Sequence, residues 1–301
     1  MRVLVTGGEG MLARHLTAAL AETGRSRPAA EAVVLGRRAL DITDGRAVDA
    51  AFAAHRPRVV VNCAAFTDVD GAESRWAEAM RVNGGGPRLL ARRCARHGVR
   101  LIHVSTDYVF PGDTRSPYGE SDAPGPRTVY GRSKLAGERA VLSLLPDTGT
   151  VVRTAWLYGG QGRSFVRTML ERAPDDGHVD VVNDQWGQPT WAGDVARLLV
   201  TLARTPPDRA RGIFHATNAG AATWYELARE VFRLAGADPE RVRPVATADR
   251  PGPAPRPACT VLGHDRWRLV GVAPPRDWRA ALREAMRQLL PGGRLRNLTG
   301  T

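Results

Sequence analysis

Short apolar runs alternate with segments of helical periodicity through the first half of the chain. The runs are nearly continuous in Val, Leu and Ile, as expected of strands covered on both faces, and they lie at residues 1–6, 32–35, 58–63, 100–105 and 151–155. Between them, apolar residues recur every three or four positions. This spacing predicts helices over residues 11–21, 45–54, 72–82, 87–97 and 130–145. The alternation predicts an α/β fold with a Rossmann-type, doubly wound parallel sheet.

The pattern is less regular after Trp156. It predicts helices over 164–172, 192–203, 224–235 and 276–290, and short strands at 179–182 and 212–215. Arg250–Pro257 is too rich in proline for a helix or a central strand, so we expect a linker or a loop laid over a site. We expect the Rossmann-type domain to take residues 1–155 with about 186–216, and a smaller C-terminal α/β domain to take about 156–185 with 217–301.

A glycine-rich turn follows the first predicted strand. Gly7, Gly10 and Ala13 form a G-x-x-G-x-x-A pattern between that strand and the first helix. Small residues let the chain turn sharply and approach a pyrophosphate, and the amides at the helix start, including those of Met11 and Leu12, can bind its oxygens. The turn therefore predicts a dinucleotide site, with a tight structural turn as the alternative.

The end of the second predicted strand favours one dinucleotide over another. An acidic residue often stands there to hold the ribose hydroxyls of NAD, but this chain has Arg37 and Arg38. Arginines can pair with a 2′-phosphate. We therefore predict NADPH as the cofactor, with NADH as the alternative.

Tyr130 and Lys134 form a Tyr-x-x-x-Lys motif at the start of a predicted helix. Residues four apart share a helical face, and a nearby ammonium favours the phenolate and lowers the pKa of a tyrosine. The pair therefore suits proton transfer, whereas a surface helix pair is the structural alternative. Ser105 and Thr106 end the fourth predicted strand, at the edge where doubly wound sheets bind ligands, so either hydroxyl could bond a substrate carbonyl.

Basic residues exceed acidic ones by 43 to 31, a net charge of +12, and all but one of the basic residues are arginine. The exception is Lys134, four residues after Tyr130, where a compact ammonium suits the chemistry better than a planar guanidinium. The arginines are spread along the whole chain, which argues against a nucleic-acid partner. Their densest group, within residues 88–100, follows helical spacing and is interpreted as a solvated helix face; attraction of an anionic substrate is a milder alternative.

Three scattered cysteines are typical of a protein from a reducing compartment. No apolar run is long enough for a membrane helix. The chain enters its first strand directly, without the apolar region of a signal peptide. We therefore expect a cytoplasmic protein without a membrane partner.

Several longer strings resemble the dTDP-4-dehydrorhamnose reductase family, within the extended short-chain dehydrogenase/reductase superfamily. The strings span residues 62–74, 105–110, 129–138, 153–159 and 183–190, together with Arg256-Pro257 and the helix over 278–290. The most specific is Ser-Thr-Asp-Tyr-Val-Phe at 105–110 with the downstream Trp156. The likeness covers nearly the whole chain.

The resemblance implies an NADPH-dependent reduction of the 4-keto group of a dTDP-4-keto-6-deoxyhexose, foremost dTDP-4-dehydro-L-rhamnose to dTDP-L-rhamnose. It implies that Tyr130 protonates the developing alkoxide, Lys134 holds the nicotinamide ribose and tunes Tyr130, and Thr106 orients the ketone. It places Asp41, Ile42, Ala64, Ala65, Phe66 and Asn83 beside the cofactor. It places Val69, Tyr108, Trp156, Gln185 and Arg256 beside the sugar, with a core position as the alternative for Trp156.

The chain departs from the family pattern at three places. Phe66 replaces a usual Tyr or His, Gly71 replaces a usual Lys, and the stretch Asn83–Gly86 is unusually rich in glycine. Some relatives dimerise through magnesium, but no matching acidic cluster accompanies Trp191 and Gly193, so we predict no metal. A monomer or a homodimer is expected.

Three alternative functions remain on the sequence alone. A 4-ketoreductase for another dTDP-deoxysugar of secondary metabolism would use the same catalytic residues. A 4,6-dehydratase or epimerase is disfavoured because Asp107-Tyr108 follows Thr106 where dehydratases usually carry Asp-Glu. A non-catalytic NADP-binding partner protein is disfavoured because both Tyr130 and Lys134 are retained.

Overall fold

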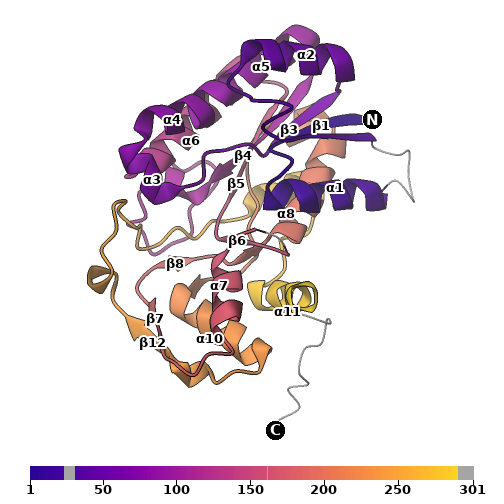
Figure 1. Cartoon of the computed structure of the whole chain (residues 1–301). Coiled ribbons are helices and arrows are strands. Elements are labelled where there is room, and N and C mark those ends of the chain that lie inside the picture. The colour runs from indigo at the N-terminus through magenta and orange to yellow at the C-terminus, as the bar shows by residue number, and fades with distance from the viewer. Residues whose placement is uncertain (24–30, 161, 291–301) are drawn as a thin grey trace.

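The computed structural model describes residues 1–23, 31–160 and 162–290, and a six-stranded sheet organises its first part (Figure 1). All strand pairs in this sheet are parallel, in the order β10-β5-β4-β3-β1-β2. The strands are β1 (Arg2–Thr6), β2 (Glu31–Leu35), β3 (Val59–Asn62), β4 (Arg100–Thr106), β5 (Gly149–Thr154) and β10 (Gly212–His215). The predicted doubly wound fold is confirmed.

Helices cover both faces of this sheet. One core contains Val3, Val5 and Val61 and is closed by α1 (Met11–Thr23) and α8 (Ala192–Arg204). The opposite core contains Leu4 and Val60 and is closed by α2 (Gly45–His55), α5 (Gly86–His97) and α6 (Val129–Leu144). Neighbouring residues of a strand point to opposite faces of the sheet. Because helices bury both faces, the strands are nearly continuous apolar runs.

The predicted single helix over 72–82 is wrong. The chain forms α3 (Val69–Ser74), α4 (Trp76–Met80) and a π-helical segment, η1 (Arg81–Gly85), before α5. Arg75 interrupts the helical backbone with φ −111° and ψ 43°. The glycines that follow allow close packing, since a Cβ at Gly84 would lie 3.2 Å from the Ala136 Cβ and one at Gly86 would lie 2.5 Å from Ile42.

The remaining elements lie outside the large sheet, and several of them enclose a separate hydrophobic cluster that includes Trp191, Phe232 and Trp278. The helices are α7 (Phe165–Arg172), α9 (Pro207–Ala210), α10 (Trp224–Ala235) and α11 (Trp278–Leu289), with η2 (Asp107–Val109), η3 (Pro239–Arg241), η4 (Thr247–Asp249) and η5 (Asp265–Val270) as 3₁₀ turns. The strands are β6 (Leu157–Tyr158), β7 (Val179–Val182), β8 (Trp186–Gly187), β9 (Thr190–Trp191), β11 (Ala222–Thr223) and β12 (Val242–Val245). Most of these lie below the large sheet in Figure 1.

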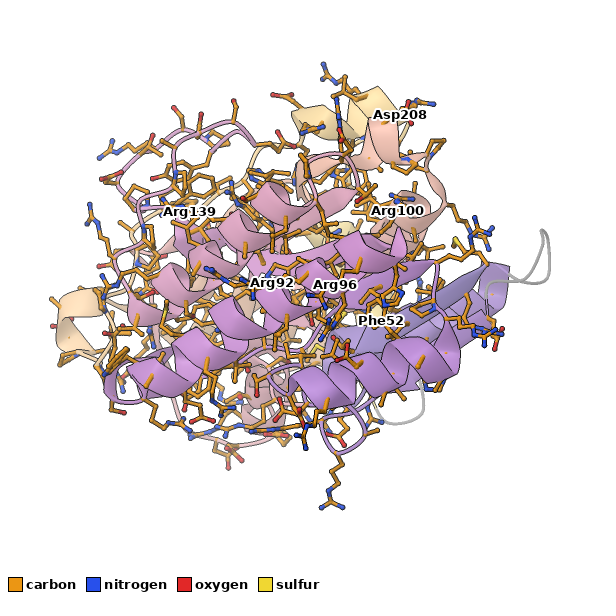
Figure 2. The ribbon with its side chains drawn as sticks, turned by 90° about the horizontal axis from the view of Figure 1, so that it is seen from above. Phe52, Arg92, Arg96, Arg100, Arg139 and Asp208 are labelled. Atoms are coloured by element: carbon orange, nitrogen blue, oxygen red, sulfur yellow. The ribbon has the colours of Figure 1, made fainter. Side chains whose placement is uncertain are left out.

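The arginines within residues 88–100, interpreted from the sequence as one solvated helix face, have different roles in the structure, so that interpretation is wrong for Arg93 and Arg100. Arg92 and Arg96 lie on the outer side of α5, as Figure 2 shows. Arg93 instead pairs with Asp49 of α2, and Arg100 donates to the carbonyls of residues 202, 203 and 205 at the end of α8. Some of these charges therefore stabilise helix packing and a helix C-terminus.

No helix among the described residues has both the length and the apolar character needed to cross a bilayer.

Candidate active site

The glycine-rich turn after β1 borders an open cleft of about 450 Å³. Gly7 has φ +69°, and a Cβ there would lie 2.7 Å from the Ala64 amide nitrogen, so only glycine fits. The Gly10 amide donates to the Gly7 carbonyl at 2.9 Å and completes the turn into α1. Of the residues predicted for the cofactor, the cleft is lined by Gly7, Gly10, Arg37, Asp41, Ile42, Ala64, Ala65 and Phe66.

Six other residues predicted for the cofactor do not line this cleft: Met11, Leu12, Arg38 and Asn83, and also Tyr130 and Lys134, which are described below. Leu12 packs into the core against β1, so only its backbone can face a ligand, and the Met11 side chain lies beside Gly159. Arg38 is exposed. Asn83 is buried and supports Phe66 through two backbone hydrogen bonds of 2.8 and 2.9 Å. Asn83 therefore positions the cleft wall.

Asp41 lies at the adenosine end predicted for this cleft. Its carboxylate accepts from the Thr43 amide and hydroxyl at 2.9 and 2.8 Å. These bonds, the backbone one foremost, lower the pKa of Asp41, and Arg37 and Arg81 act in the same direction. Asp41 is thus a fixed anion beside two arginines.

Arg75 is a cleft residue that the sequence reasoning missed. Its guanidinium lies over the Phe66 ring, 4.7 Å from the centroid, and bonds Asp68 at 2.6 Å. A Cβ at Gly71 would lie 2.5 Å from this guanidinium, so the loss of the side chain at Gly71 makes room for it. The remaining lining residues that were not predicted are Glu9, Leu40, Cys63, Thr67, Asp68, Glu78 and Val82.

Thr106 and Tyr130 meet at the carboxyl end of β4. Thr106 ends the strand, and Thr128 caps α6 by accepting from the Gly131 amide, which sets Tyr130 in the first turn of that helix. Burial raises the pKa of Tyr130, whereas the Thr106 hydroxyl acts in the opposite direction by hydrogen bonding. The Tyr108 ring packs edge-on against Tyr130, with centroids 5.8 Å apart. Tyr130 is thereby kept protonated at neutral pH.

Lys134 is buried one turn further along α6. Its Nζ donates to the Val104 carbonyl at 2.7 Å, behind the strand end that carries Thr106. Burial lowers the pKa of Lys134 to about 8, while Glu138 and then Cys63 raise it. We expected Lys134 to lower the pKa of Tyr130, but the group that does so in this structure is Thr106.

The residues predicted to contact a sugar come from separate segments. Val69 begins α3, and Tyr108 follows Thr106 in η2. Trp156 has a left-handed backbone, φ 44°, and its ring stacks on Trp224 at 3.5 Å between centroids. The Gln185 amide donates to the Thr247 hydroxyl at 2.9 Å. Trp156 and Gln185 therefore both have partners within the C-terminal part.

Arg256 shows how the proline-rich segment is placed. Its guanidinium bonds Asp70 of α3 at 2.7 Å, and the Ala254 amide donates to the same carboxylate at 3.2 Å. Another terminal nitrogen of Arg256, Nη1, is buried without a hydrogen-bond partner among the described residues. The segment 250–257 is thus a loop that lies against α3.

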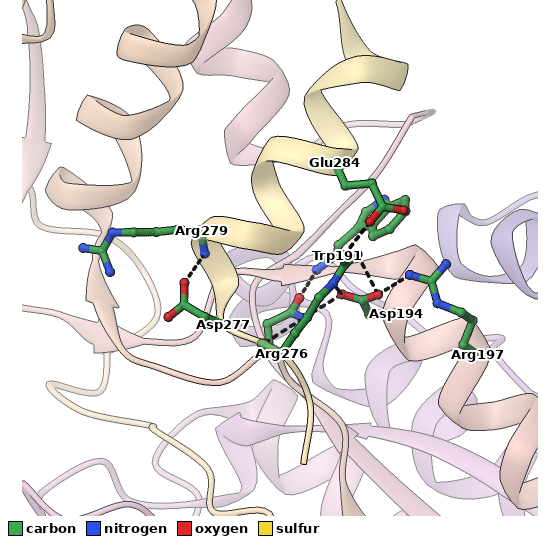
Figure 3. Close-up of polar contacts among 8 residues, drawn as sticks. Trp191, Asp194, Arg197, Arg276, Asp277, Arg279 and Glu284 are labelled. Atoms are coloured by element: carbon green, nitrogen blue, oxygen red, sulfur yellow. Dashed lines mark hydrogen bonds and ion pairs between the residues drawn. The ribbon is translucent and has the colours of Figure 1, made fainter. Parts of the chain in front are cut away.

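Charged side chains gather around Trp191, as Figure 3 shows. Asp194 accepts from Arg276 at 2.9 and 3.0 Å and from Asn218 at 2.7 Å, and it also pairs with Arg197. Arg197 and Arg276 both lie near the Trp191 ring. Within the described ranges, no cluster of three His, Cys, Asp or Glu side chains could hold a metal ion.

Comparisons with known proteins cover nearly the same residues. The family model described as RmlD substrate binding domain matches residues 1–290. A probable dTDP-4,6-dihydroxy-2-methyloxan-3-one 4-ketoreductase of Streptomyces antibioticus is 57% identical over 96% of each chain. A dTDP-4-dehydrorhamnose reductase of Streptomyces griseus is 55% identical over 94% of this chain and 92% of its own.

A solved structure shares the fold as well. The crystal structure of dTDP-4-dehydrorhamnose reductase from Bacillus anthracis in complex with NADP has a TM-score of 0.89 and 33% identity, covering 95% of this chain and 98% of the other. The glycine turn, the strand end at Thr106 and the Tyr130/Lys134 helix lie within this likeness. The chain therefore belongs to the dTDP-4-dehydrorhamnose reductase family of extended short-chain dehydrogenases/reductases.

Proposed function

We propose that this protein uses NADPH to reduce the 4-keto group of a dTDP-4-keto-6-deoxyhexose, foremost dTDP-4-dehydro-L-rhamnose to dTDP-L-rhamnose. The observation that carries the proposal is the meeting of Thr106 and Tyr130 at the end of β4, with Lys134 buried behind them. Relatives with the names given above support the substrate class.

The cleft residues fit a dinucleotide. Gly7 permits close approach where a Cβ would collide with Ala64, and the start of α1 offers amides to a pyrophosphate. Arg37 and Asp41 line the end assigned to adenosine. Bound NADPH would supply the hydride in this reaction.

The side chains divide the remaining tasks. Tyr130, kept neutral by burial, donates its phenolic proton to the oxygen of the ketone as negative charge develops there. Thr106 hydrogen-bonds and orients that oxygen. Lys134 supplies a positive charge at the base of the site, and the free nitrogen of Arg256 can bind an anionic group of the nucleotide sugar.

A second candidate is the reduction of another dTDP-deoxysugar of secondary metabolism. The Streptomyces antibioticus relative is named as a probable 4-ketoreductase of a different dTDP-linked ketone, dTDP-4,6-dihydroxy-2-methyloxan-3-one, and this supports the reduction of another dTDP-deoxysugar. The test is a panel of dTDP-keto sugars, with NADPH oxidation followed by absorbance and each product identified by mass and NMR. Turnover of dTDP-4-dehydro-L-rhamnose supports the first proposal. Preference for another ketone supports the second, and cofactor binding without any turnover would instead support a non-catalytic partner protein.

We also propose how the chain is divided and where it acts. Residues 1–155 with about 186–216 would bind the cofactor, and about 156–185 with 217–301 would bind the nucleotide sugar. The separate core that joins Val166, Phe232 and Trp278 supports a distinct C-terminal unit, and Trp191 of the 186–216 segment packs into that core. The protein would act in the cytoplasm as a monomer or homodimer, without nucleic acid or membrane as a partner.

We expect kcat to fall as the pH rises through about 8. The reason is Lys134, whose pKa is lowered to about 8 by burial, so that its positive charge disappears above that pH. The measurement is the pH profile of kcat at saturating NADPH and ketone. Constant kcat up to pH 9.5 would contradict a role for the charged form of Lys134.

Arg37 and Arg38 offer a matched test of cofactor choice. Arg37 lines the cleft, whereas Arg38 does not. If Arg37 pairs with the 2′-phosphate, Arg37→Ser should raise KM for NADPH about tenfold, since a hydrogen bond to a charged group contributes roughly 1.5 kcal/mol at the low end. KM for NADH, which lacks that phosphate, should change little. Arg38→Ser is the control. If both variants raised KM for NADPH equally, Arg37 would not be the residue that pairs with the 2′-phosphate.

A further inference from the structure

Asp107, directly after Thr106, has a buried carboxyl group that lies between two threonine hydroxyls. It is 2% exposed. The Thr106 hydroxyl donates to its Oδ1 at 2.9 Å, and the Thr260 hydroxyl donates to its Oδ2 at 2.5 Å. Thr260 comes from the segment that follows Pro257, so this carboxyl joins the end of β4 to a distant part of the chain.

The hydrogen bonds of Thr106 limit what it can do for a substrate. A hydroxyl has one proton to donate and can accept two bonds. Thr106 Oγ1 already accepts from the Tyr108 amide at 3.2 Å, and its proton is directed to Asp107. While Asp107 is ionised, donation to a ketone oxygen therefore requires breaking the bond to the carboxylate.

Protonation of Asp107 reverses this bond. A carboxyl that has taken up a proton from water can donate it to Thr106 Oγ1. The second lone pair of Oγ1 is free to accept it when Tyr130 directs its hydroxyl to the ketone and not to Thr106. The Thr106 hydroxyl then turns its own proton toward the ketone oxygen. No covalent bond changes other than the uptake of the proton.

We propose that Asp107 is a positioning residue that sets the direction of the Thr106 hydroxyl, and that Thr260 biases Asp107 toward its ionised form by donating to Oδ2. This inference rests on the proposed ketone reduction.

The surroundings of Asp107 bring its titration near neutrality. Burial raises the pKa of Asp107 to about 6, against the lowering effect of the bonds from Thr260 and then Thr106. Tyr130 of α6 and Tyr108 of η2 are the titratable groups on which it acts. Lys134 of α6 is held at the Val104 carbonyl. The proline-rich segment brings Arg256, which is paired with Asp70.

The bond from Thr260 also makes the site depend on the placement of a whole segment. On one side of Thr260, the Cys259 amide donates to the Gly112 carbonyl at 3.1 Å. On the other side, the Leu262 amide donates to the side-chain oxygen of Gln188, Oε1, at 2.8 Å. These bonds fix the Thr260 hydroxyl over Asp107.

The experiment compares wild type with Asp107→Asn and Thr260→Val by the pH profile of kcat between pH 5 and 8, at saturating NADPH and ketone. For wild type we expect kcat to fall about tenfold as the pH rises through about 6, since donation by Thr106 then costs one hydrogen bond. Asp107→Asn, which cannot titrate, should lack this fall. Thr260→Val removes a donor to the carboxylate and should move the fall to higher pH by about one unit, with KM little changed.

Thr168→Val, at an exposed position of α7, is the matched control and should keep the wild-type profile. A lower melting temperature with an unchanged profile in both site variants would show a merely structural role and overturn the inference. Wild type that reduces no dTDP-keto sugar would remove the proposed function, and this inference with it. Wild-type turnover without a fall near pH 6 would overturn the inference alone.

Discussion

We expect Tyr130→Phe to reduce kcat by between about a hundredfold and ten-thousandfold while leaving NADPH binding unchanged. This is the usual contribution of a positioned general acid. The substitution removes only the hydroxyl. The edge-on contact with Tyr108 and the Thr128 cap of α6 stay in place, so the helix should keep its position. The measurements are steady-state NADPH oxidation with the preferred ketone and a fluorescence titration of NADPH.

Tyr108→Phe is the control for this experiment. Tyr108 lies against Tyr130 and burial raises its pKa to about 12, but its hydroxyl has no assigned proton to transfer. We expect it to change KM for the sugar more than kcat. If Tyr130→Phe kept kcat within tenfold of wild type, another group would have to supply the proton.

The large sheet and its helices could be predicted because their pattern is local. Each strand of the sheet is a run of apolar residues, and the helices between them keep one apolar stripe. Strands of two residues, such as β6 and β9, are too short to leave a recognisable apolar pattern in the sequence. Their residues Tyr158 and Trp191 pack in a core that is built from distant segments. The break at Arg75 likewise depends on its bond to Asp68 and its contact with Phe66.

The candidate site could be predicted only where its residues lie in short strings. Gly7, Thr106, Tyr130 and Lys134 each belong to a motif that carries its own chemistry. Thr260 is separated from Asp107 by 153 positions, and no periodicity links them. For Arg75 the sequence did hold one indication, the missing side chain at Gly71, whose consequence appears only when the guanidinium occupies that space.

The second large effect concerns the buried ion pair beneath the site. Arg153 of β5 and Glu138 of α6 are each 1% exposed and bond through two parallel contacts of 3.0 and 2.7 Å. Arg153 also lies over the Phe110 ring, 4.8 Å from its centroid. Removing one partner leaves the other charge buried without its counter-charge, and we expect Glu138→Gln to lower the free energy of unfolding by about 3–5 kcal/mol. The measurement is urea unfolding followed by circular dichroism.

The exposed pair of Arg167 and Glu171 on α7, at 46% and 67% exposure, provides the control. Glu171→Gln should lower the free energy of unfolding by less than about 1 kcal/mol, because solvent screens an exposed pair.

The double variant Glu138→Gln with Arg153→Met should lose less free energy of unfolding than the sum of the two single variants, since it buries no unpaired charge. Glu138 also raises the pKa of Lys134, so its loss should move the alkaline fall of kcat below pH 8 in protein that is still folded. Equal costs for the buried and exposed substitutions would show that this pair does not hold α6 against β5.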